Sequence, residues 1–213
     1  MTSLSRNSSS SPRFEIVIAS TNSHKLREFR FMMKHLAQFD VLSLADFPNY
    51  VSPEETGTTF EENAILKATT AAKNLNRWVL ADDSGLVVPA LGGAPGIFSA
   101  RYAGLNATDF ENRKKLLDQM QYLMEEDRQA FYECCLSLAS PAGLKKCVKG
   151  TCEGALLSQD RGGSGFGYDP LFVKHGYSKS FAEIDESIKN RISHRRKALD
   201  KMILSLESMV SSA

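Results

Sequence analysis

The chain has 213 residues, of which 42% are hydrophobic, and its formal net charge is +1 at pH 7. That length fits one domain, or one domain with two lobes around a cleft, with enough apolar side chains for a sizeable core. A charge so close to neutral argues against a protein that binds nucleic acid through bulk positive charge, although a local basic cluster lies near the C-terminus. No apolar run approaches the roughly 20 residues needed to cross a bilayer, so we expect no membrane partner.

Two further features bear on organisation and location. The four cysteines show neither a Cys-x-x-Cys spacing nor a neighbouring histidine pattern, which is typical of reduced structural thiols in a cytoplasmic protein. Residues 1–12 are rich in serine and lack an apolar segment, so they predict a disordered tail rather than a secretory signal. We therefore expect a tail over residues 1–12 and one globular domain over residues 13–213.

The first predicted elements are a strand over residues 14–19 and a helix that carries apolar residues at helical spacing from Leu26. Between them lies a polar loop made of Ser20, Thr21, Asn22, Ser23, His24 and Lys25. Hydroxyls, an amide and free backbone N–H groups at a helix N-terminus, with a lysine one turn in, are the chemistry of a phosphate cradle. The Gly-x-x-x-x-Gly-Lys frame of a Walker A loop is absent. Ordinary capping of the helix by Asn22 or Ser23 is the alternative.

A short strand over residues 41–44 and a loop precede the acidic pair Glu54-Glu55. Thr59 and Glu62 have capping-box spacing, which predicts the start of a second helix. Asn63 and Lys67 stand four residues apart on that helix and flank its apolar stripe, so their side chains are neighbours. The acidic pair is a candidate source of metal ligands.

The central stretch begins with a predicted buried strand, Trp78-Val79-Leu80, and the two adjacent carboxylates of Asp82 and Asp83 follow at its expected end. Ser84 and a glycine come next. Adjacent carboxylates repel each other unless a cation or solvent compensates them, so the arrangement suits Mg²⁺. A solvated turn is the alternative reading.

Beyond this stretch, Thr108 and Glu111 again predict a helix start, and residues 130–139 and 146–153 predict a scaffold hairpin that turns at residues 141–143. A glycine-rich loop then carries Phe166, Gly167, Tyr168 and Asp169; its glycines allow close approach of a ligand, and its aromatic rings could stack on a planar base. A packed turn remains possible. Finally, a basic cluster over residues 189–197 stands at the start of the last predicted helix, where the helix dipole disfavours it unless an anion lies nearby.

Six ordered motifs together resemble the inosine triphosphate pyrophosphatase (Ham1-like) family from about residue 14 to the last helix. They are STNSHK (20–25), EETGTTFEENA (54–64), ADDSGL (81–86), GGAPGIFSARY (92–102), GFGYDP (165–170) and SHR (193–195). The resemblance implies an α/β fold with a long mixed β-sheet flanked by helices, two lobes with a central nucleotide-binding cleft, and a homodimer. It also implies Mg²⁺-dependent hydrolysis of non-standard purine nucleoside triphosphates (ITP, dITP, XTP) to the monophosphate and pyrophosphate.

The resemblance also implies roles for individual residues. Asp83 would be the catalytic proton acceptor and would share Mg²⁺ with Glu54. Substrate would be bound by Ser20, Thr21, Asn22, Ser23, His24, Lys25, Lys67, Ser84, Phe166, Gly167, Tyr168, Asp169, Lys189, His194 and Arg195. One departure is Ser20-Thr21-Asn22 where the family usually has Thr-Gly-Asn; the missing glycine could change how closely that backbone approaches phosphate.

Three other readings compete with this one. Maf-like nucleotide pyrophosphatases share the fold and a phosphate loop after the first strand, but they lack the Ser-His-Arg and Phe-Gly-Tyr-Asp combination. A nucleotide-binding sensor that no longer hydrolyses has no need of the acidic pairs kept here. A nucleic-acid partner rests only on the basic run, and the near-neutral net charge weakens it.

Overall fold

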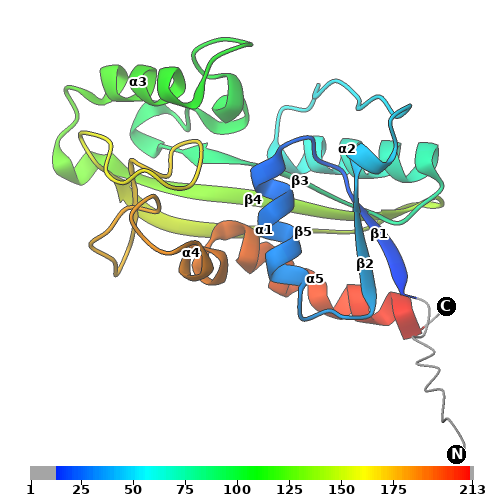
Figure 1. The fold of residues 1–213 in the computed structure, drawn as a ribbon. Coiled ribbons are helices and arrows are strands. Elements are labelled where there is room, and N and C mark those ends of the chain that lie inside the picture. The colour runs from blue at the N-terminus through cyan, green and yellow to red at the C-terminus, as the bar shows by residue number, and fades with distance from the viewer. Residues whose placement is uncertain (1–12, 212–213) are drawn as a thin grey trace, which may run out of the picture.

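The computed structural model describes residues 13–211 as an α/β fold built on a curved six-stranded sheet flanked by helices (Figure 1). The tail predicted for residues 1–12 lies outside the described residues. The strand order is β2-β1-β3-β4-β5-β6. The strands are β1 (Phe14–Ile18), β2 (Phe39–Ser43), β3 (Val79–Val87), β4 (Gln129–Ser140), β5 (Gly143–Leu156) and β6 (Phe172–Lys174).

The sheet changes character at β3. β1 runs parallel to both β2 and β3, whereas β3, β4, β5 and β6 pair antiparallel. The pairing of β1 with β3 stops at Leu80, but β3 continues to Val87 beside β4. Beyond Leu80, one edge of β3 therefore has no neighbouring strand among the described residues, and a crevice can open there.

This geometry corrects one expectation from the sequence. Asp82 and Asp83 do not stand at the end of their strand; they lie in the middle of β3. The strand that ends beside them is β1. Because successive side chains of a strand point to opposite faces, the two carboxylates also diverge instead of forming one ligand pair.

Helices cover both faces of the sheet (Figure 1). α1 and α5 pack on one face, where they share a hydrophobic cluster with β1, β3 and β4. α2 packs on the opposite face against β3 and β4. The helices are α1 (Ser23–Met33), α2 (Phe60–Leu75), α3 (Asp109–Met120), α4 (Glu186–Ile192) and α5 (His194–Ser211). Short 3₁₀ turns are Leu44–Asp46, Pro89–Leu91, Gly96–Arg101 and Glu125–Arg128.

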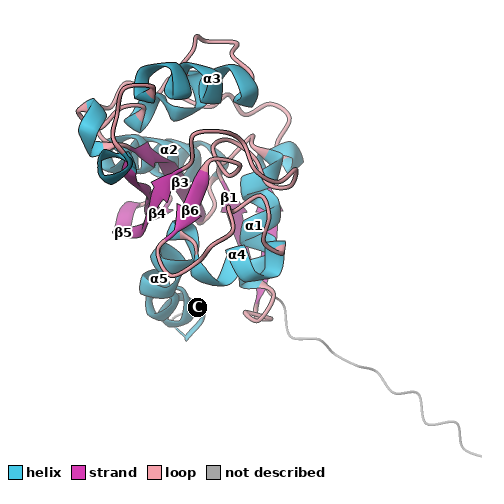
Figure 2. Cartoon of the chain, turned by 90° about the vertical axis from the view of Figure 1, so that its left-hand side faces the viewer, coloured by secondary structure: helices cyan, strands magenta, loops and turns pink. Residues whose placement is uncertain are grey.

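Two large hydrophobic clusters define two lobes. The first gathers β1, α1 and α5 around one half of β3 and β4. The second gathers α3, the other half of β3 and β4, and the segment from Tyr168 to Phe181. Seen from the side, α3 and its loops stand above the strands and α1, α4 and α5 lie below or beside them (Figure 2). None of the described helices is long and apolar enough to cross a membrane.

Most local expectations are met, with two differences. Thr108 and Glu111 form the predicted capping box. The Thr59 hydroxyl accepts from the Glu62 N–H as predicted, but the Glu62 carboxylate accepts from Thr58 instead of completing the box. The basic run is not the start of one helix: it is divided at Ser193 between the last turn of α4 and the first turn of α5.

Candidate active site

A cavity of about 350 Å³ lies between the lobes at the edge where β1 stops. It collects most of the predicted site residues from distant parts of the chain. Those that line it are Ser20, Thr21, Asn22, Lys25, Lys67, Asp83, Ser84, Phe166, Gly167, Tyr168, Asp169, Lys189, His194 and Arg195. Of the other three predicted residues, Ser23 begins α1, His24 stacks on Phe166, and Glu54 lies on the exposed loop before α2.

The polar loop after β1 caps helix α1. The Asn22 side-chain oxygen accepts hydrogen bonds from the N–H groups of His24 (3.0 Å) and Lys25 (3.1 Å). This is the capping role predicted as an alternative, and it is compatible with the other role because the loop still faces the cavity. The N-terminus of an eleven-residue helix therefore points its positive dipole end at the cavity.

Asp82 lies on the α1 and α5 side of β3 and is only 2% exposed. Its Oδ2 atom forms ion pairs with Lys25 (3.1 Å) and Arg195 (3.0 Å), and it accepts a hydrogen bond from the Ser84 hydroxyl (2.9 Å). Burial alone would raise the pKa of this carboxyl, but Lys25 and Arg195 hold it well below its usual range. Asp82 is therefore a permanent anion at the base of the cleft.

Asp83 lies on the α2 side of the same strand. Its carboxylate accepts from Lys67 Nζ (2.8 Å) and from the Asn63 amide (3.3 Å). Burial raises the pKa of Asp83, and the opposing effect of Lys67 does not cancel it. Two neighbouring aspartates thus have pKa values shifted in opposite directions, a pattern that separates a structural carboxylate from a proton-accepting one.

Lys67 links Asp83 to the acidic loop before α2. Its ammonium also contacts Glu55 Oε1 at 2.8 Å, and Glu55 is held in addition by Arg101 (3.3 Å). Burial raises the pKa of Glu55, but Lys67 and Arg101 outweigh it and the pKa is lowered. Glu55 is therefore an ionised carboxylate whose charge is already compensated by two cations.

Glu54, the predicted metal ligand, is exposed and is not among the residues that line the cavity. The structure thus brings Glu55, not Glu54, into contact with the Lys67–Asp83 pair. No ion pair engages the Glu54 carboxylate among residues 13–211, and this part of the chain holds no cluster of three or more metal-ligating side chains. A Mg²⁺ ion needs few of them, because it usually keeps several waters and takes one or two carboxylates plus substrate phosphates.

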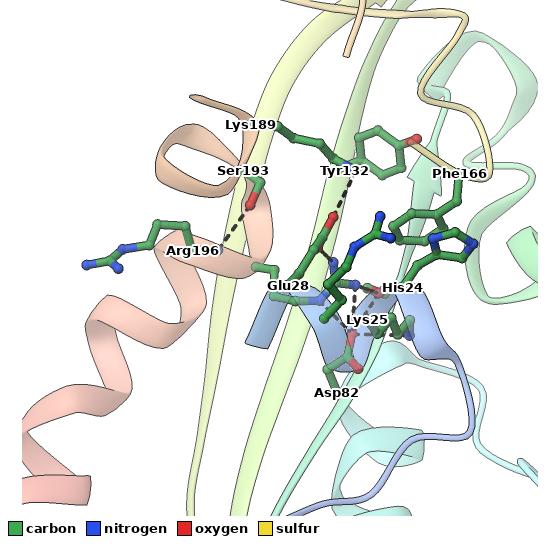
Figure 3. Close-up of polar contacts among 12 residues, drawn as sticks. His24, Lys25, Glu28, Asp82, Tyr132, Phe166, Lys189, Ser193 and Arg196 are labelled. Carbon is green, nitrogen blue, oxygen red and sulfur yellow. Dashed lines mark hydrogen bonds and ion pairs between the residues drawn. The ribbon is translucent and has the colours of Figure 1, made fainter. Parts of the chain in front are cut away.

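The other end of the cavity is built on a buried charge network (Figure 3). Glu28 of α1 is 3% exposed and accepts from both Lys189 (2.9 Å) and Arg195. Lys189 also pairs with Asp169, and Arg195 with Asp82. These internal carboxylates supply the anions for the two buried cations of the basic cluster, Lys189 and Arg195.

Aromatic rings lie beside this network. The His194 ring stacks on Tyr132 with centroids 4.7 Å apart, and His24 stacks on Phe166 at 5.0 Å. Lys189 Nζ lies 4.6 Å from the centre of the Phe166 ring, a cation–π contact. Burial, together with the positive charges of Arg195 and Lys189, lowers the pKa of His194 well below its usual range, so this imidazole is neutral at pH 7.

Several residues of the cavity or the charge network were not predicted. Glu28 and Tyr132 contact predicted residues directly, Arg101 pairs with Glu55, and Asn63 was noted only as a neighbour of Lys67. The one signal for Glu28 is a carboxylate next to the apolar stripe of α1. Its partners stand more than 150 positions later in the chain, so nothing local reveals the pairing.

Fold and site together define an α/β protein with a deep inter-lobe cleft that presents a helix N-terminus, paired lysines and an aromatic loop, the features of a nucleotide-binding enzyme. Comparison with known proteins gives the particular family. The profile of the Ham1 family matches residues 16–204, and the chain belongs to that family.

Individual relatives agree with this assignment. A dITP/XTP pyrophosphatase of Protochlamydia amoebophila is 64% identical over 196 residues, which cover 92% of this chain and 98% of the relative. The solved structure of the Staphylococcus aureus Ham1 protein is 43% identical, with a TM-score of 0.80, and the match covers 92% of this chain and 99% of that one. A HAM1 protein structure from Coxiella burnetii is 40% identical, with a TM-score of 0.81 and coverage of 94% and 100%.

Proposed function

We propose that this protein hydrolyses non-standard purine nucleoside triphosphates, such as ITP, dITP and XTP, to the nucleoside monophosphate and pyrophosphate. The proposal is supported by the names of its relatives, dITP/XTP pyrophosphatases at up to 64% identity. The observation that carries it most directly is the pair of aspartates in β3: one is held ionised by Lys25 and Arg195, and the other has a raised pKa and faces the cavity beside Lys67.

The phosphate end of the ligand is assigned to the α1 side of the cleft. The loop over residues 20–25 would receive the phosphates at the helix N-terminus, and Lys25 is only 3.1 Å from Asp82, so it can turn from that carboxylate to a phosphate oxygen. Lys67, shared between Asp83 and Glu55, is the second lysine within reach of the cavity.

Asp83 is assigned as the proton acceptor for the attacking water. A carboxylate whose pKa lies above its usual range is a stronger base than an ordinary aspartate, and such assistance is typically worth about 10²–10⁴-fold in rate. The water would attack the α-phosphorus, the bond from that phosphorus to the bridging oxygen would break, and pyrophosphate would leave. Lys67 both orients Asp83 and limits the rise of its pKa.

We assign Mg²⁺ to Asp83 and Glu54, because Glu55 is already neutralised by Lys67 and Arg101 whereas the Glu54 carboxylate has no ion pair in the described chain. When bound, the ion would offset charge on the phosphates. A Mg²⁺ titration of activity tests this choice: Glu54→Gln should raise the half-saturating Mg²⁺ concentration about tenfold or more, and Glu55→Gln should raise it less. The reverse order would move the ligand to Glu55.

The base is assigned to the aromatic and buried-charge end of the cleft, where it would meet Phe166, His194 and Arg195. Arg195 has five N–H donors, and four of its hydrogen bonds go to Asp82, Glu28 and Ser84, which leaves one Nη1 donor for a 6-keto oxygen. The 6-amino group of adenine would instead point hydrogen toward hydrogen, and sites of this kind reject such analogues by roughly 10⁴–10⁵-fold. Exclusion of guanine would fall to its 2-amino group meeting the loop over residues 166–169.

Two further parts of the proposal rest on the family, for the homodimer, and on the cysteine pattern of the sequence, for the location. We infer that the protein acts as a homodimer and works in the cytoplasm, where its substrates form. Sedimentation and size-exclusion measurements over a concentration series would test the first, and imaging of a tagged chain would test the second.

The deciding experiment measures pyrophosphate release by the purified chain with Mg²⁺. ITP, dITP and XTP should be hydrolysed, with ATP and GTP far poorer substrates, and the chelator EDTA should stop the reaction. Asp83→Asn protein prepared in parallel controls for contaminating phosphatases. Equal rates on ITP and ATP, or release of single phosphates instead of pyrophosphate, would contradict the proposal.

A further inference from the structure

The tip of the aromatic loop is held by helix α3 through its backbone. The Gly167 N–H donates to Asp109 Oδ2 at 2.7 Å, and the Gly167 carbonyl accepts from Arg113 Nη1 at 2.9 Å. Asp109 and Arg113 stand four residues apart on α3, so they share one face of the helix. Both polar groups of one residue are thus bonded to charged side chains from a single helix.

Holding both groups fixes more than Gly167 itself. Its N–H belongs to the peptide plane shared with Phe166, and its carbonyl belongs to the plane shared with Tyr168. Fixing both planes restricts the backbone angles on either side, and hence the directions in which these two aromatic side chains leave the chain. Gly167 has a φ of 61°, a left-handed backbone conformation that glycine adopts without the steric strain that a Cβ atom would cause.

Arg113 also ties the loop tip to the loop base. Its guanidinium contacts both oxygens of Asp160 at 2.9–3.0 Å, and Asp160 stands at the beginning of the loop. The neck is closed by a backbone hydrogen bond from Arg161 to Pro170 (2.9 Å). Arg113 therefore spans from one end of the loop to its tip, and its side chain is 14% exposed.

The attachment continues on the other side of the tip, where the Tyr168 hydroxyl donates to the Ser99 carbonyl at 3.0 Å. Leu116 of α3 and Tyr168 also lie in the same hydrophobic cluster. The backbone of the loop tip is thus joined to the α3 lobe, whereas the Phe166 ring stacks on His24 of α1, which belongs to the other lobe. Arg113 is not among the described residues that line the cavity, whereas Asp109 is.

We propose that Arg113, supported by Asp109, is a positioning residue for base recognition: Arg113 lies outside the cavity lining and holds the Phe166–Tyr168 tip in the orientation that receives the purine. This inference rests on the proposed function for its substrate. It predicts that loss of Arg113 weakens recognition of the base while leaving phosphate binding and the chemical step nearly intact.

The first test measures the loop directly, by hydrogen exchange and mass spectrometry on the full chain without ligand. Arg113→Ala should speed amide exchange in residues 162–170 and leave exchange in α1 and β3 unchanged. Lys114→Ala is the matched control, because Lys114 is the next residue of the same helix, is 64% exposed and pairs with Asp118 on the surface. Unchanged exchange in Arg113→Ala would show that Arg113 does not hold the loop tip, and would overturn the proposal.

The second test separates base from phosphate recognition. Arg113→Ala should raise the KM for ITP roughly 10- to 100-fold, the range for losing a hydrogen bond to a charged group, with kcat within about threefold. Inhibition by inorganic tripolyphosphate, which has no base, should match the wild type. Arg113→Lys and Asp109→Asn keep partial bonding to Gly167 and should fall between wild type and Arg113→Ala.

Each remaining outcome decides the matter. If Arg113→Ala weakens ITP and tripolyphosphate equally, the residue supports the whole cleft and the positioning role is wrong. If the KM for ITP is unchanged, the hydrogen bonds of Arg113 to the loop do not serve recognition of the base. If wild-type protein leaves ITP intact, the proposed function and the base-recognition role both fail. The exchange experiment would still show whether Arg113 holds the loop tip.

Discussion

Asp82 and Asp83 are adjacent in sequence and share one strand, yet they lie in two different regions of the molecule. Asp82 faces α1 and α5, where Lys25 and Arg195 neutralise it. Asp83 faces α2, where Lys67 is shared with Glu55 and burial still raises the pKa. On the first side Lys25 and Arg195 hold the pKa of Asp82 low despite its burial, whereas on the second side Lys67 does not offset the burial of Asp83.

The difference assigns separate tasks to the two faces. A buried carboxylate that is paired with two cations stabilises the fold only as long as those partners remain, and its low pKa keeps it ionised. A carboxylate with a raised pKa lowers stability at neutral pH but is ready to accept a proton or a metal ion. Mutations on the two faces should therefore produce opposite combinations of stability and activity.

The largest expected effect is on turnover at the α2 face. Asp83→Asn should lower kcat about 10²–10⁴-fold because the proton acceptor is lost. Folding stability should be equal or higher at pH 7. The raised pKa means that the ionised form of Asp83 is disfavoured in the folded state, which lowers the free energy of unfolding only above the unfolded pKa of about 4. The substitution removes this destabilising charge. Urea denaturation and pyrophosphate release on the same preparation check this. A variant that is destabilised and still active would break the comparison.

On the opposite face, Asp82→Asn should lower the free energy of unfolding by about 3–5 kcal/mol, because Arg195, which is 1% exposed, would lose one of its two carboxylate partners and Lys25 would lose its own. The dependence on pH should also change. Since the folded pKa is depressed, the stabilisation by Asp82 is complete above pH 4 and is lost as the pH falls further, so the variant should show a flatter stability profile below pH 4. Full stability with low kcat would transfer the catalytic role to Asp82.

Lys67→Met should move the pH dependence of activity. Lys67 lowers the pKa of Asp83, so its removal lets that pKa rise further, and the acid limb of kcat/KM should shift to higher pH. Lys73→Met is the matched control, since Lys73 lies on the exposed side of the same helix. An unshifted limb would mean that a different group controls activity.

The smallest effect concerns the link between Ser84 and the Asp82 network. Ser84→Ala removes a hydroxyl that donates to Asp82 and accepts from Arg195, and should cost about 1–2 kcal/mol of stability. Combined with Asp82→Asn, the loss should be clearly less than additive, because both changes remove parts of one network. Strict additivity in denaturation experiments would show that Ser84 acts outside it.

The sequence predicted the family, the α/β class and half of the residues that line the cavity, because these depend on local motifs and on strand and helix periodicity. It misplaced Asp82 and Asp83 at a strand end, since the apparent boundary is made by β1, a strand that begins more than 60 residues earlier. Glu28 was not predicted at all. Its two cationic partners come from α4 and α5, and only the fold brings them to α1.

Strands β3 and β4 run through both lobes, and this has a mechanical consequence. β4 contributes Leu136 to the first hydrophobic cluster and Tyr132 to the second, and β3 does the same with Leu80 and Leu86. The lobes are therefore joined by continuous, hydrogen-bonded β-strands and not by a flexible linker. A movement of one lobe relative to the other would have to bend these paired strands, so their hydrogen bonds oppose it.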